Sequence, residues 1–384
     1  MTSPARKLLS VLDDRTAHDL WTGMLADAGV TVGGDAPWDL TIHDDRLFTR
    51  VARDGHLGLG EAYVDGWWDA PRVDQLLERV LRARLDREVR DSWVLMAHAV
   101  RARIFNAQLS RPREVAERHY DIGNDLYEVM LDRRLAYTCG YWKDAANLDD
   151  AQEAKLDLVC RKLGLRRGMR VLELGSGWGS FASFAAERYG VEVVAYNVST
   201  EQVAWAREHY GHLPIDFHLE DYRNAAGTFD AVVSIGLMEH VGPKNYRAYM
   251  ELVERCLTPD GVALIHTIGS NRTRDYADPW FDRYIFPNAV FPTLGRLADA
   301  MEDTLVPEDV HNIGPHYDRT LMAWWERFDA GWPRLRDRYG DRFYRMWKYY
   351  LLCSAATFRA RFLQLYQVVM TRQCAPQPRG ARTS

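Results

Sequence analysis

Beyond about residue 115, short apolar runs alternate with segments whose apolar residues recur at helical spacing. The runs have the length of buried strands and lie at residues 170–174, 191–195, 215–218, 229–235 and 261–268. Residues 181–189 have helical spacing, and Ser199 is placed to cap a helix that extends through Tyr210. Because turn or helix signals separate successive runs, the pattern predicts an α/β fold with a doubly wound parallel sheet. A late apolar run at 362–370 predicts one further strand.

The N-terminal part of the chain carries a different pattern. Residues 1–85 mix helical segments with short strand-like runs and end in a helix with apolar residues at 73, 76, 77, 80 and 81. They predict a small mixed domain that precedes a larger domain over residues 115–370. Residues 371–384 contain Pro, Gly and Arg but no acidic residue, which predicts a disordered tail.

A basic segment joins the two expected domains. Residues 82–113 hold eight arginines against three acidic residues, interleaved with apolar side chains such as Trp93 and Phe105. We expect a basic amphipathic linker over residues 86–114. Two interpretations stay open at this point: a solvated helix that ties the domains together, or a surface that faces a membrane.

Composition narrows the class of protein. The 384 residues suffice for two or three domains, and 47% apolar with 27% charged residues excludes wholly disordered and collagen-like chains. A net charge of -5 does not favour nucleic acid as a partner. The five cysteines form no C-x-x-C pair and have no zinc-site spacing, so we expect no metal and a reducing compartment. No run of about 18 apolar residues occurs, so we expect a cytoplasmic protein whose contact with a membrane is peripheral.

A glycine-rich sequence at 173–179 lies where an expected strand passes into a helix. Glycine permits the backbone angles of such a turn and a close approach of a ligand to the main chain. The spacing of Gly175, Gly177 and Gly179 fits the dinucleotide fingerprint less well than the loop of S-adenosylmethionine enzymes. The next strand ends without the acid that usually binds the ribose in NAD enzymes.

Polar residues follow the later strands instead. The amide groups of Asn197 and Gln202 could bond hydroxyl groups, and Glu220 and Asp221 offer acceptors for an adenine amino group. Each of these residues taken alone could equally be a helix cap or a turn residue. Their joint placement beside the glycine loop favours cofactor binding.

Seven motifs resemble those of the cyclopropane-fatty-acyl-phospholipid synthases, and the resemblance covers nearly the whole chain. The motifs lie at residues 58–68, 119–125, 137–142, 238–246, 266–269, 284–287 and 316–324. The resemblance implies a seven-stranded methyltransferase sheet and transfer of a methylene unit from S-adenosylmethionine to a cis double bond of an unsaturated phospholipid acyl chain. It further implies a carbocation, a bound bicarbonate that assists deprotonation, and ring closure to a cyclopropane. With it we expect a homodimer at the inner face of the membrane.

The same resemblance assigns residues by matching motif. The bicarbonate site that it implies consists of Cys139, Glu239, His266, Ile268 and Tyr317. The cofactor contacts that it implies are Tyr137, Gly175, Gly177, Asn197, Gln202 and Glu220, to which we add Thr138 and Asp221. Family members often have a cysteine in place of Ser176, a serine in place of Thr138 and a threonine in place of Asn197. These differences are polar or isosteric, so cofactor binding is still expected.

The chemistry of the implied reaction suits these residue types. An alkene is a poor nucleophile, so the methyl donor must be held against it in a dry channel, where proximity contributes up to roughly 7–11 kcal/mol. Water would quench the carbocation, whereas aromatic faces stabilise it. The base must be small, and a small anion held by backbone N–H groups, a phenol and an imidazole would serve.

Each implied catalytic residue also has an ordinary structural interpretation. Alone, Cys139 would be a small buried hydrophobe, His266 a core histidine, Glu239 a helix-start acid and Tyr317 an anchored core phenol. Within the enzyme class, the alternative outcome is a methyl- or methylene-branched acyl chain or a methylated small natural product. From another class, the chain could be an inactive membrane-binding module, against which the intact Glu239, His266 and Tyr317 argue.

Overall fold

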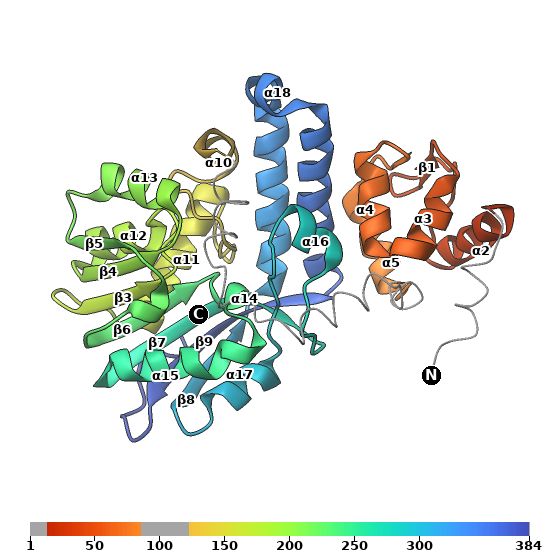
Figure 1. The fold of residues 1–384 in the computed structure, drawn as a ribbon. Coiled ribbons are helices and arrows are strands. Elements are labelled where there is room, and N and C mark those ends of the chain that lie inside the picture. The colour runs from red at the N-terminus through yellow and green to blue at the C-terminus, as the bar shows by residue number, and fades with distance from the viewer. Residues whose placement is uncertain (1–13, 86–122, 384) are drawn as a thin grey trace. The chain divides into compact units, whose positions relative to one another are not determined.

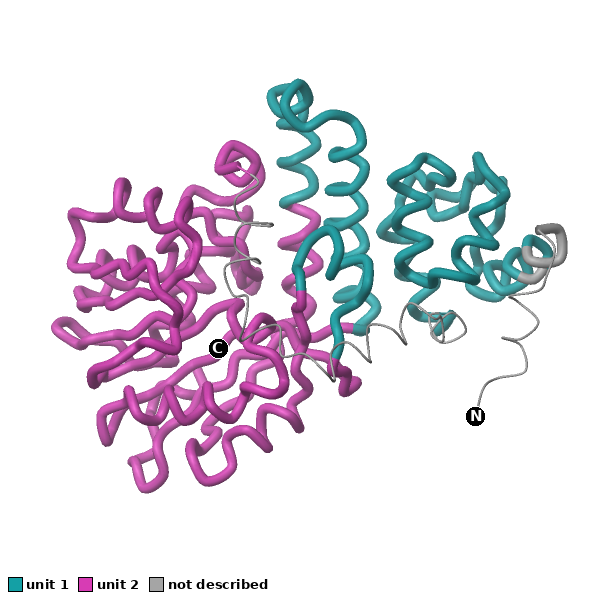
Figure 2. The backbone as a smooth tube through the Cα atoms, viewed as in Figure 1, with its two compact units in different colours: residues 1–105, 276–287, 324–362 teal, residues 106–275, 288–323, 363–384 magenta. Residues whose placement is uncertain are grey.

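The structure is a computed structural model that describes residues 14–85 and 123–383. The chain folds into two compact units (Figure 2). Unit 1 comprises residues 1–105, 276–287 and 324–362, and unit 2 comprises residues 106–275, 288–323 and 363–384. The linker expected at 86–114 lies outside the described residues.

This division differs from the one expected at residues 85 and 115. Two later segments, 276–287 and 324–362, pack with the N-terminal residues and belong to unit 1. Helical periodicity marks a face as buried but does not say which element buries it. A sequence pattern therefore predicts contiguous domains, whereas unit 1 is assembled from three stretches of chain.

Unit 2 is built on a seven-stranded sheet with the order β5-β4-β3-β6-β7-β9-β8 (Figure 1). Its strands are β3 (Arg170–Leu174), β4 (Glu192–Asn197), β5 (Ile215–Leu219), β6 (Phe229–Ile235), β7 (Leu257–Ser270), β8 (Leu305–Asn312) and β9 (Leu363–Arg372). The first five strands in this order pair in parallel, and β9 is antiparallel to both β7 and β8. The predicted α/β sheet is confirmed, with an antiparallel strand inserted near one edge.

Helices cover both faces of this sheet. The helices of unit 2 are α10 (Asn124–Met130), α11 (Leu148–Lys162), α12 (Ser180–Tyr189), α13 (Thr200–Tyr210), α14 (Met238–Val241), α15 (Tyr246–Cys256) and α17 (Leu294–Met301). Side chains alternate along each strand: Leu172 packs in the cluster with α15 and α17, while Val171 packs in the cluster with α11 and α12. As predicted, Ser199 caps α13, and its hydroxyl accepts from the backbone N–H of Gln202 at 3.3 Å.

The C-terminal segment differs from the predicted disordered tail. Residues 371 and 372 complete β9, Ala381 is buried in the cluster that contains α11 and α12, and Gln377 donates to Glu308 at 3.0 Å. Composition predicted disorder because the segment has few large apolar residues. Besides the buried Ala381, polar contacts of Thr371, Arg372 and Gln377 hold the segment on unit 2.

Unit 1 combines short N-terminal helices with later ones. It contains α2 (Asp14–Asp27), β1 (Thr41–Ile42), α3 (Arg46–Asp54), α4 (His56–Val64), β2 (Trp68–Asp69), α5 (Val73–Arg82), α16 (Pro279–Tyr284) and most of α18 (Gly314–Arg359). The two-residue strands β1 and β2 pair antiparallel. Within α18, Gly340 has a φ of +75° and interrupts the helix, so the chain turns back on itself (Figure 1).

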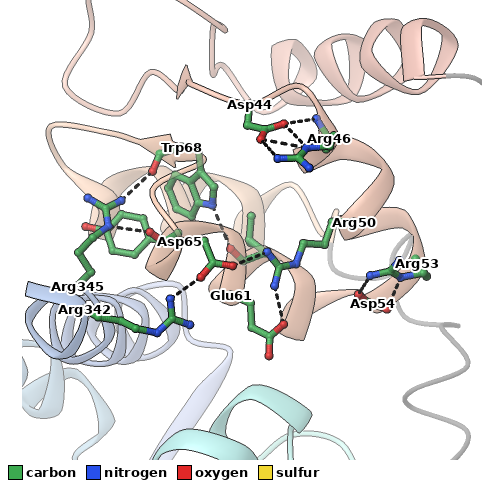
Figure 3. A network of polar contacts seen from close by, with 12 residues as sticks. Asp44, Arg46, Arg50, Arg53, Asp54, Glu61, Asp65, Trp68, Arg342 and Arg345 are labelled. Carbon is green, nitrogen blue, oxygen red and sulfur yellow. Dashed lines mark hydrogen bonds and ion pairs between the residues drawn. The ribbon is translucent and has the colours of Figure 1, made fainter.

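Ion pairs fasten the N-terminal elements of unit 1 to α18 (Figure 3). Arg50 contacts Glu61 at 2.7 Å and Asp65 at 2.8 Å, and Asp65 also accepts from Arg342 of α18. Arg345 of the same helix donates to the backbone carbonyl of Tyr63 at 2.8 Å. The Arg50 side chain is only 15% exposed, so its pairs are better shielded from water than surface ion pairs.

An aromatic cluster closes around Gly60 of α4. The rings of Tyr349 and Trp280 lie 4.8 Å apart, and those of Tyr349 and Tyr63 lie 5.5 Å apart. A Cβ on Gly60 would stand 2.4 Å from Trp280 Cδ1 and 2.9 Å from Tyr349 Cε1. Only glycine at position 60 lets α4, α16 and α18 approach this closely.

We therefore expect Gly60→Ala to destabilise unit 1 by about 1–3 kcal/mol, since the added methyl group overpacks a filled core. Urea unfolding followed by tryptophan fluorescence measures the effect. Gly23→Ala is the matched control, because Gly23 is an exposed helix residue with no atom within 4 Å of its added Cβ. That control should leave stability unchanged or raise it by up to about 1 kcal/mol. Equal midpoints for Gly60→Ala and the wild type would contradict the packing argument.

Candidate active site

The glycine loop leaves β3 at the carboxyl edge of the sheet. Gly175, Gly177 and Gly179 have φ angles of +82°, +55° and +80°, which disfavour any other residue. The backbone N–H of Gly175 donates to the carbonyl of Tyr196 at 2.9 Å, which ties the loop to the end of β4. A Cβ on Gly177 would meet no atom of the described residues within 4 Å, so they leave open space beside the loop. This open space leaves a ligand room to approach the main chain.

Asn197 and Gln202 meet beside this loop. Asn197 Nδ2 donates to the carbonyl of Gly177 at 3.1 Å and to Gln202 Oε1 at 2.9 Å, while Asn197 Oδ1 accepts from the backbone of Val198 at 2.8 Å. The structure thus brings together three residues that the sequence predicts for the cofactor. Their mutual bonds fix the position of both amide groups.

The two acids after β5 differ in their contacts. The Glu220 side chain is 51% exposed and lies 3.7 Å from His218 Nδ1. Asp221 instead accepts from the backbone N–H of Arg223 at 2.9 Å and from its guanidinium at 2.8 Å. Burial opposes the charge of Asp221, but these contacts outweigh it and lower the pKa of the carboxyl group. Asp221 is therefore a capping residue with its carboxylate engaged, and Glu220 is the better candidate to accept from adenine.

Residues 137–142, here called the strap, lie beside the loop that follows β6. Gly140 donates its N–H to Thr320 Oγ1 at 3.0 Å, and the backbone of Trp142 donates to His316 Nδ1 at 2.8 Å, so the strap is bonded to the first turns of α18. Tyr317, buried at 8% exposure, is the residue next to His316. The ring of Tyr137 packs against Tyr127 at 5.2 Å.

Cys139 sits in this strap as a buried thiol. Its Sγ lies 3.2 Å from the carbonyl of Gly140, and the residue is 0% exposed. Burial raises the pKa of the thiol above its ordinary range, so the thiol stays protonated. Cys139 can offer backbone groups to a ligand, but it is not an activated nucleophile.

Glu239 joins the ends of β6 and β7. Its Oε1 accepts from the backbone N–H of Ile268 at 2.6 Å, while its Oε2 is buried and has no hydrogen-bond partner among the described residues. Burial raises the pKa of the carboxyl group to about 7, against the opposing effect of the Ile268 bond. Because the N–H of Ile268 is engaged, Ile268 acts here by orienting Glu239.

His266 presents a second buried atom without a partner. Its Nδ1 lies 3.3 Å from Gln367 Nε2, and within residues 14–85 and 123–383 its Nε2 has no hydrogen-bond partner. Burial, aided by the charges of Lys155 and Lys162, lowers the pKa of the imidazole well below its ordinary value, so the ring is neutral. Since the Gln367 amide donates to Nδ1, the remaining proton belongs on Nε2, which can then donate to a ligand.

Several buried polar residues at this edge were not predicted from the sequence. They are Gln152, Lys155, Glu173, Thr320 and Gln367, each nearly or fully buried. The sequence held one signal for Lys155. Ala151 lies four residues before it, and Leu158 and Val159 lie three and four residues after it; all three are apolar and buried. That spacing places Lys155 on the buried face of α11.

The described residues show neither a membrane-spanning helix nor a cluster of metal ligands. Among residues 14–85 and 123–383, no helix is both long and apolar enough to cross a membrane. The same residues contain no group of three or more His, Cys, Asp or Glu side chains arranged to hold a metal ion.

Comparisons with known proteins agree on one family. The family model described as mycolic acid cyclopropane synthetase matches residues 107–368. The cyclopropane-fatty-acyl-phospholipid synthase of Escherichia coli strain K12 is 46% identical over 377 residues, which cover 97% of each chain. The tuberculostearic acid methyltransferase UfaA1 of Mycobacterium tuberculosis is 32% identical and covers 94% of this chain and 90% of its own. The mycolic acid cyclopropane synthase CmaA1 complexed with SAH and CTAB is 28% identical, covers 67% of this chain and 98% of its own, and superposes with a TM-score of 0.64.

Proposed function

The chain belongs to the mycolic acid cyclopropane synthetase family, and we propose that it transfers a methylene unit from S-adenosylmethionine to a cis double bond of a phospholipid acyl chain. The observation that carries this proposal is the 46% identity over nearly the full length of a cyclopropane-fatty-acyl-phospholipid synthase. In balance, the methyl group would leave the sulfonium sulfur, which becomes a thioether, and would bond to one alkene carbon, so that a cation forms on the other. That methyl group would then lose a proton to a bound bicarbonate, and the electron pair of the broken C–H bond would close the ring.

The loop after β3 fits the cofactor that this reaction needs. S-adenosylmethionine, when bound, supplies the methyl group as an electrophile. The positive φ angles and open space at Gly177 suit a ligand that approaches the main chain. Asn197 would hold the amide group of Gln202 in place, Gln202 Nε2 would donate to hydroxyl groups, and Glu220 would accept from the adenine amino group.

The buried atoms without partners fit a small anion. Leaving a polar atom unpaired inside a protein costs roughly 1–3 kcal/mol, so Glu239 Oε2 and His266 Nε2 together favour a polar guest. Bicarbonate, when bound, supplies a base small enough to reach a methyl group beside a buried chain. His266 would donate to one of its oxygens, and Glu239 would hold its protonated oxygen. The backbone of Cys139 and the phenol of Tyr317 complete the proposed site.

The decisive experiment is incubation of the protein with methyl-labelled S-adenosylmethionine and vesicles of unsaturated phospholipid. Proton NMR of the extracted lipid should show label in cyclopropane ring methylene signals, which lie apart from those of branched chains. Mass alone does not decide, since ring closure and a methylene branch both add CH2. Unlabelled lipid would overturn the proposal. Label in a methyl or methylene branch would favour the second candidate function, synthesis of a branched acyl chain. The 32% identity with a tuberculostearic acid methyltransferase supports that candidate.

In the same assay, Glu239→Gln and His266→Ala should each lower turnover by roughly 100-fold or more, as expected for groups that support proton transfer. Cys139→Ser should keep a substantial part of the activity, because the thiol is protonated and the backbone is unchanged. Circular dichroism controls for folding. If the Cys139→Ser variant were inactive while the Glu239→Gln variant were fully active, the roles assigned to Cys139 and Glu239 would be wrong and a thiol mechanism would be required.

We also propose that the protein is a homodimer that associates peripherally with the inner face of the membrane through basic residues. One arginine of the basic segment 82–113 is already engaged in unit 1, because Arg82 pairs with Glu78 at 2.8 Å. The other arginines expected to face lipid in residues 86–113 lie outside the described residues. The proposed attraction to anionic lipid therefore rests on that segment.

Co-sedimentation with vesicles tests this attraction. Binding should rise with anionic lipid content and weaken as salt increases, since each basic residue contributes up to about 1 kcal/mol within a Debye length of about 8 Å. Arg101→Gln/Arg103→Gln should weaken binding by up to about 30-fold, from roughly 2 kcal/mol of lost attraction. Arg166→Gln/Arg167→Gln removes the same charge from exposed positions of unit 2 and should have a smaller effect. Equal binding to neutral and anionic vesicles at every salt concentration would refute the proposal.

A further inference from the structure

Helix α11 buries two lysines, Lys155 at 1% exposure and Lys162 at 0%. Lysine is almost never fully buried unless it is paired. Lys162 has a carboxylate partner, because its Nζ lies 3.2 Å from Asp309 Oδ2. Lys155 differs, since its Nζ bonds to a hydroxyl group, Thr138 Oγ1, at 2.9 Å. Lys155 thus places a buried ammonium group against a neutral hydroxyl group of residues 137–142 rather than against a carboxylate.

The chemistry of the two groups fixes the direction of this bond. An ammonium group has three donors and no acceptor, so Thr138 Oγ1 must accept. The hydroxyl proton of Thr138 then points elsewhere and is available to a second group. A hydroxyl that accepts from a cation is also a stronger donor, because hydrogen bonds in a chain polarise one another. The bond from Lys155 therefore leaves the Thr138 hydroxyl proton free to be donated to another group and makes Thr138 a stronger donor.

Contacts place this donor at the glycine loop. A Cβ on Gly236 would stand 3.0 Å from Thr138 Cγ2, and Gly236 directly follows β6. The next residue, Leu237, would be 3.3 Å from a Cβ on Gly175. The Thr138 side chain is half-buried, so a ligand in the loop can reach it. Thr138 therefore borders the β6 side of the loop, at the carboxyl edge where parallel sheets bind ligands.

The strand order says which end of the cofactor meets Thr138. The proposed adenosine contacts follow β4 and β5, which lie on one side of β3. The amino-acid end of the cofactor must then extend toward β6, on the other side of β3. The carboxylate at that end is the acceptor that a polarised hydroxyl prefers.

We propose that Lys155 is a positioning residue for S-adenosylmethionine: it makes Thr138 Oγ1 accept, so that the Thr138 hydroxyl donates to the carboxylate of the cofactor's methionine part. This inference rests on the proposed function. The charged and titratable groups that surround Lys155 are Asp132, Cys139, Glu173 and His266. Burial lowers the pKa of Lys155 to about 8, and the nearby Asp132 counters part of this effect and favours the charged donor.

Calorimetric binding of two probes to the full-length protein tests the inference. S-adenosylhomocysteine carries the carboxylate, whereas methylthioadenosine keeps the adenosine and the thioether but lacks the amino-acid end. Lys155→Met and Thr138→Val should each weaken S-adenosylhomocysteine binding by about tenfold or more, as for a lost bond to a charged group, and leave methylthioadenosine binding unchanged. Their effects should not add in the double variant, because both remove the same bond.

Lys162→Met is the matched control, since it also removes a buried ammonium group from α11. It should preserve the ratio of the affinities for S-adenosylhomocysteine and methylthioadenosine. Thr138→Ser keeps the hydroxyl and should also preserve it. If Lys155→Met does not fold, the comparison of Thr138→Val with Thr138→Ser still decides, because equal affinities for S-adenosylhomocysteine would overturn the inference. Additive effects, or equal weakening of both probes by Lys155→Met, would likewise overturn it. Failure of the wild type to bind either probe would instead overturn the proposed function.

Discussion

Parallel pairing of β5, β4, β3, β6 and β7 is the constraint on which the candidate site depends. Strands that run in one direction deliver all their carboxyl ends to one edge, where the loops that follow them meet. The glycine loop after β3, Asn197 at the end of β4, Glu239 after β6 and Ile268 in β7 come together for this reason. A bond of 2.6 Å from Ile268 N–H to Glu239 then ties the helix that follows β6 to the end of β7.

Buried polar groups gather at this edge at a cost to stability. In the part of the chain that the structure describes, Glu239 Oε2, His266 Nε2 and Glu173 Oε2 have no hydrogen-bond partner. Burial raises the pKa of Glu239 to about 7 and that of Glu173 to about 8. An apolar core of the same volume would avoid these costs. Their concentration beside one loop is typical of a site arranged for a polar ligand, since functional groups with perturbed pKa values cluster where chemistry occurs.

Unit 1 follows a different principle from the sheet of unit 2. Its three stretches of chain are held by charge pairs such as Arg283 with Glu61 and Arg342 with Asp65, and by the aromatic contacts that surround Gly60. These contacts join residues more than two hundred positions apart, as in the 2.8 Å bond from Arg345 to the carbonyl of Tyr63. Removal of residues 1–85 would therefore expose Trp280 and Tyr349, so vesicle binding is better tested on the full chain.

The sequence by itself determined several elements of unit 2 and the motifs, whereas α11, β8 and α18 were not predicted. Apolar runs of strand length, the Ser199 cap and the glycine spacing at 175–179 are local signals, and each element forms close to where its pattern predicts it. Tertiary structure decided what depends on distant residues. It assigned residues 324–362 to unit 1, held Ala381 in the core and engaged Asp221 with Arg223, and it buried Lys155 beside Thr138. The reason is physical: periodicity reports that a side chain is buried, but whether a buried polar atom finds a partner depends on every element that packs around it.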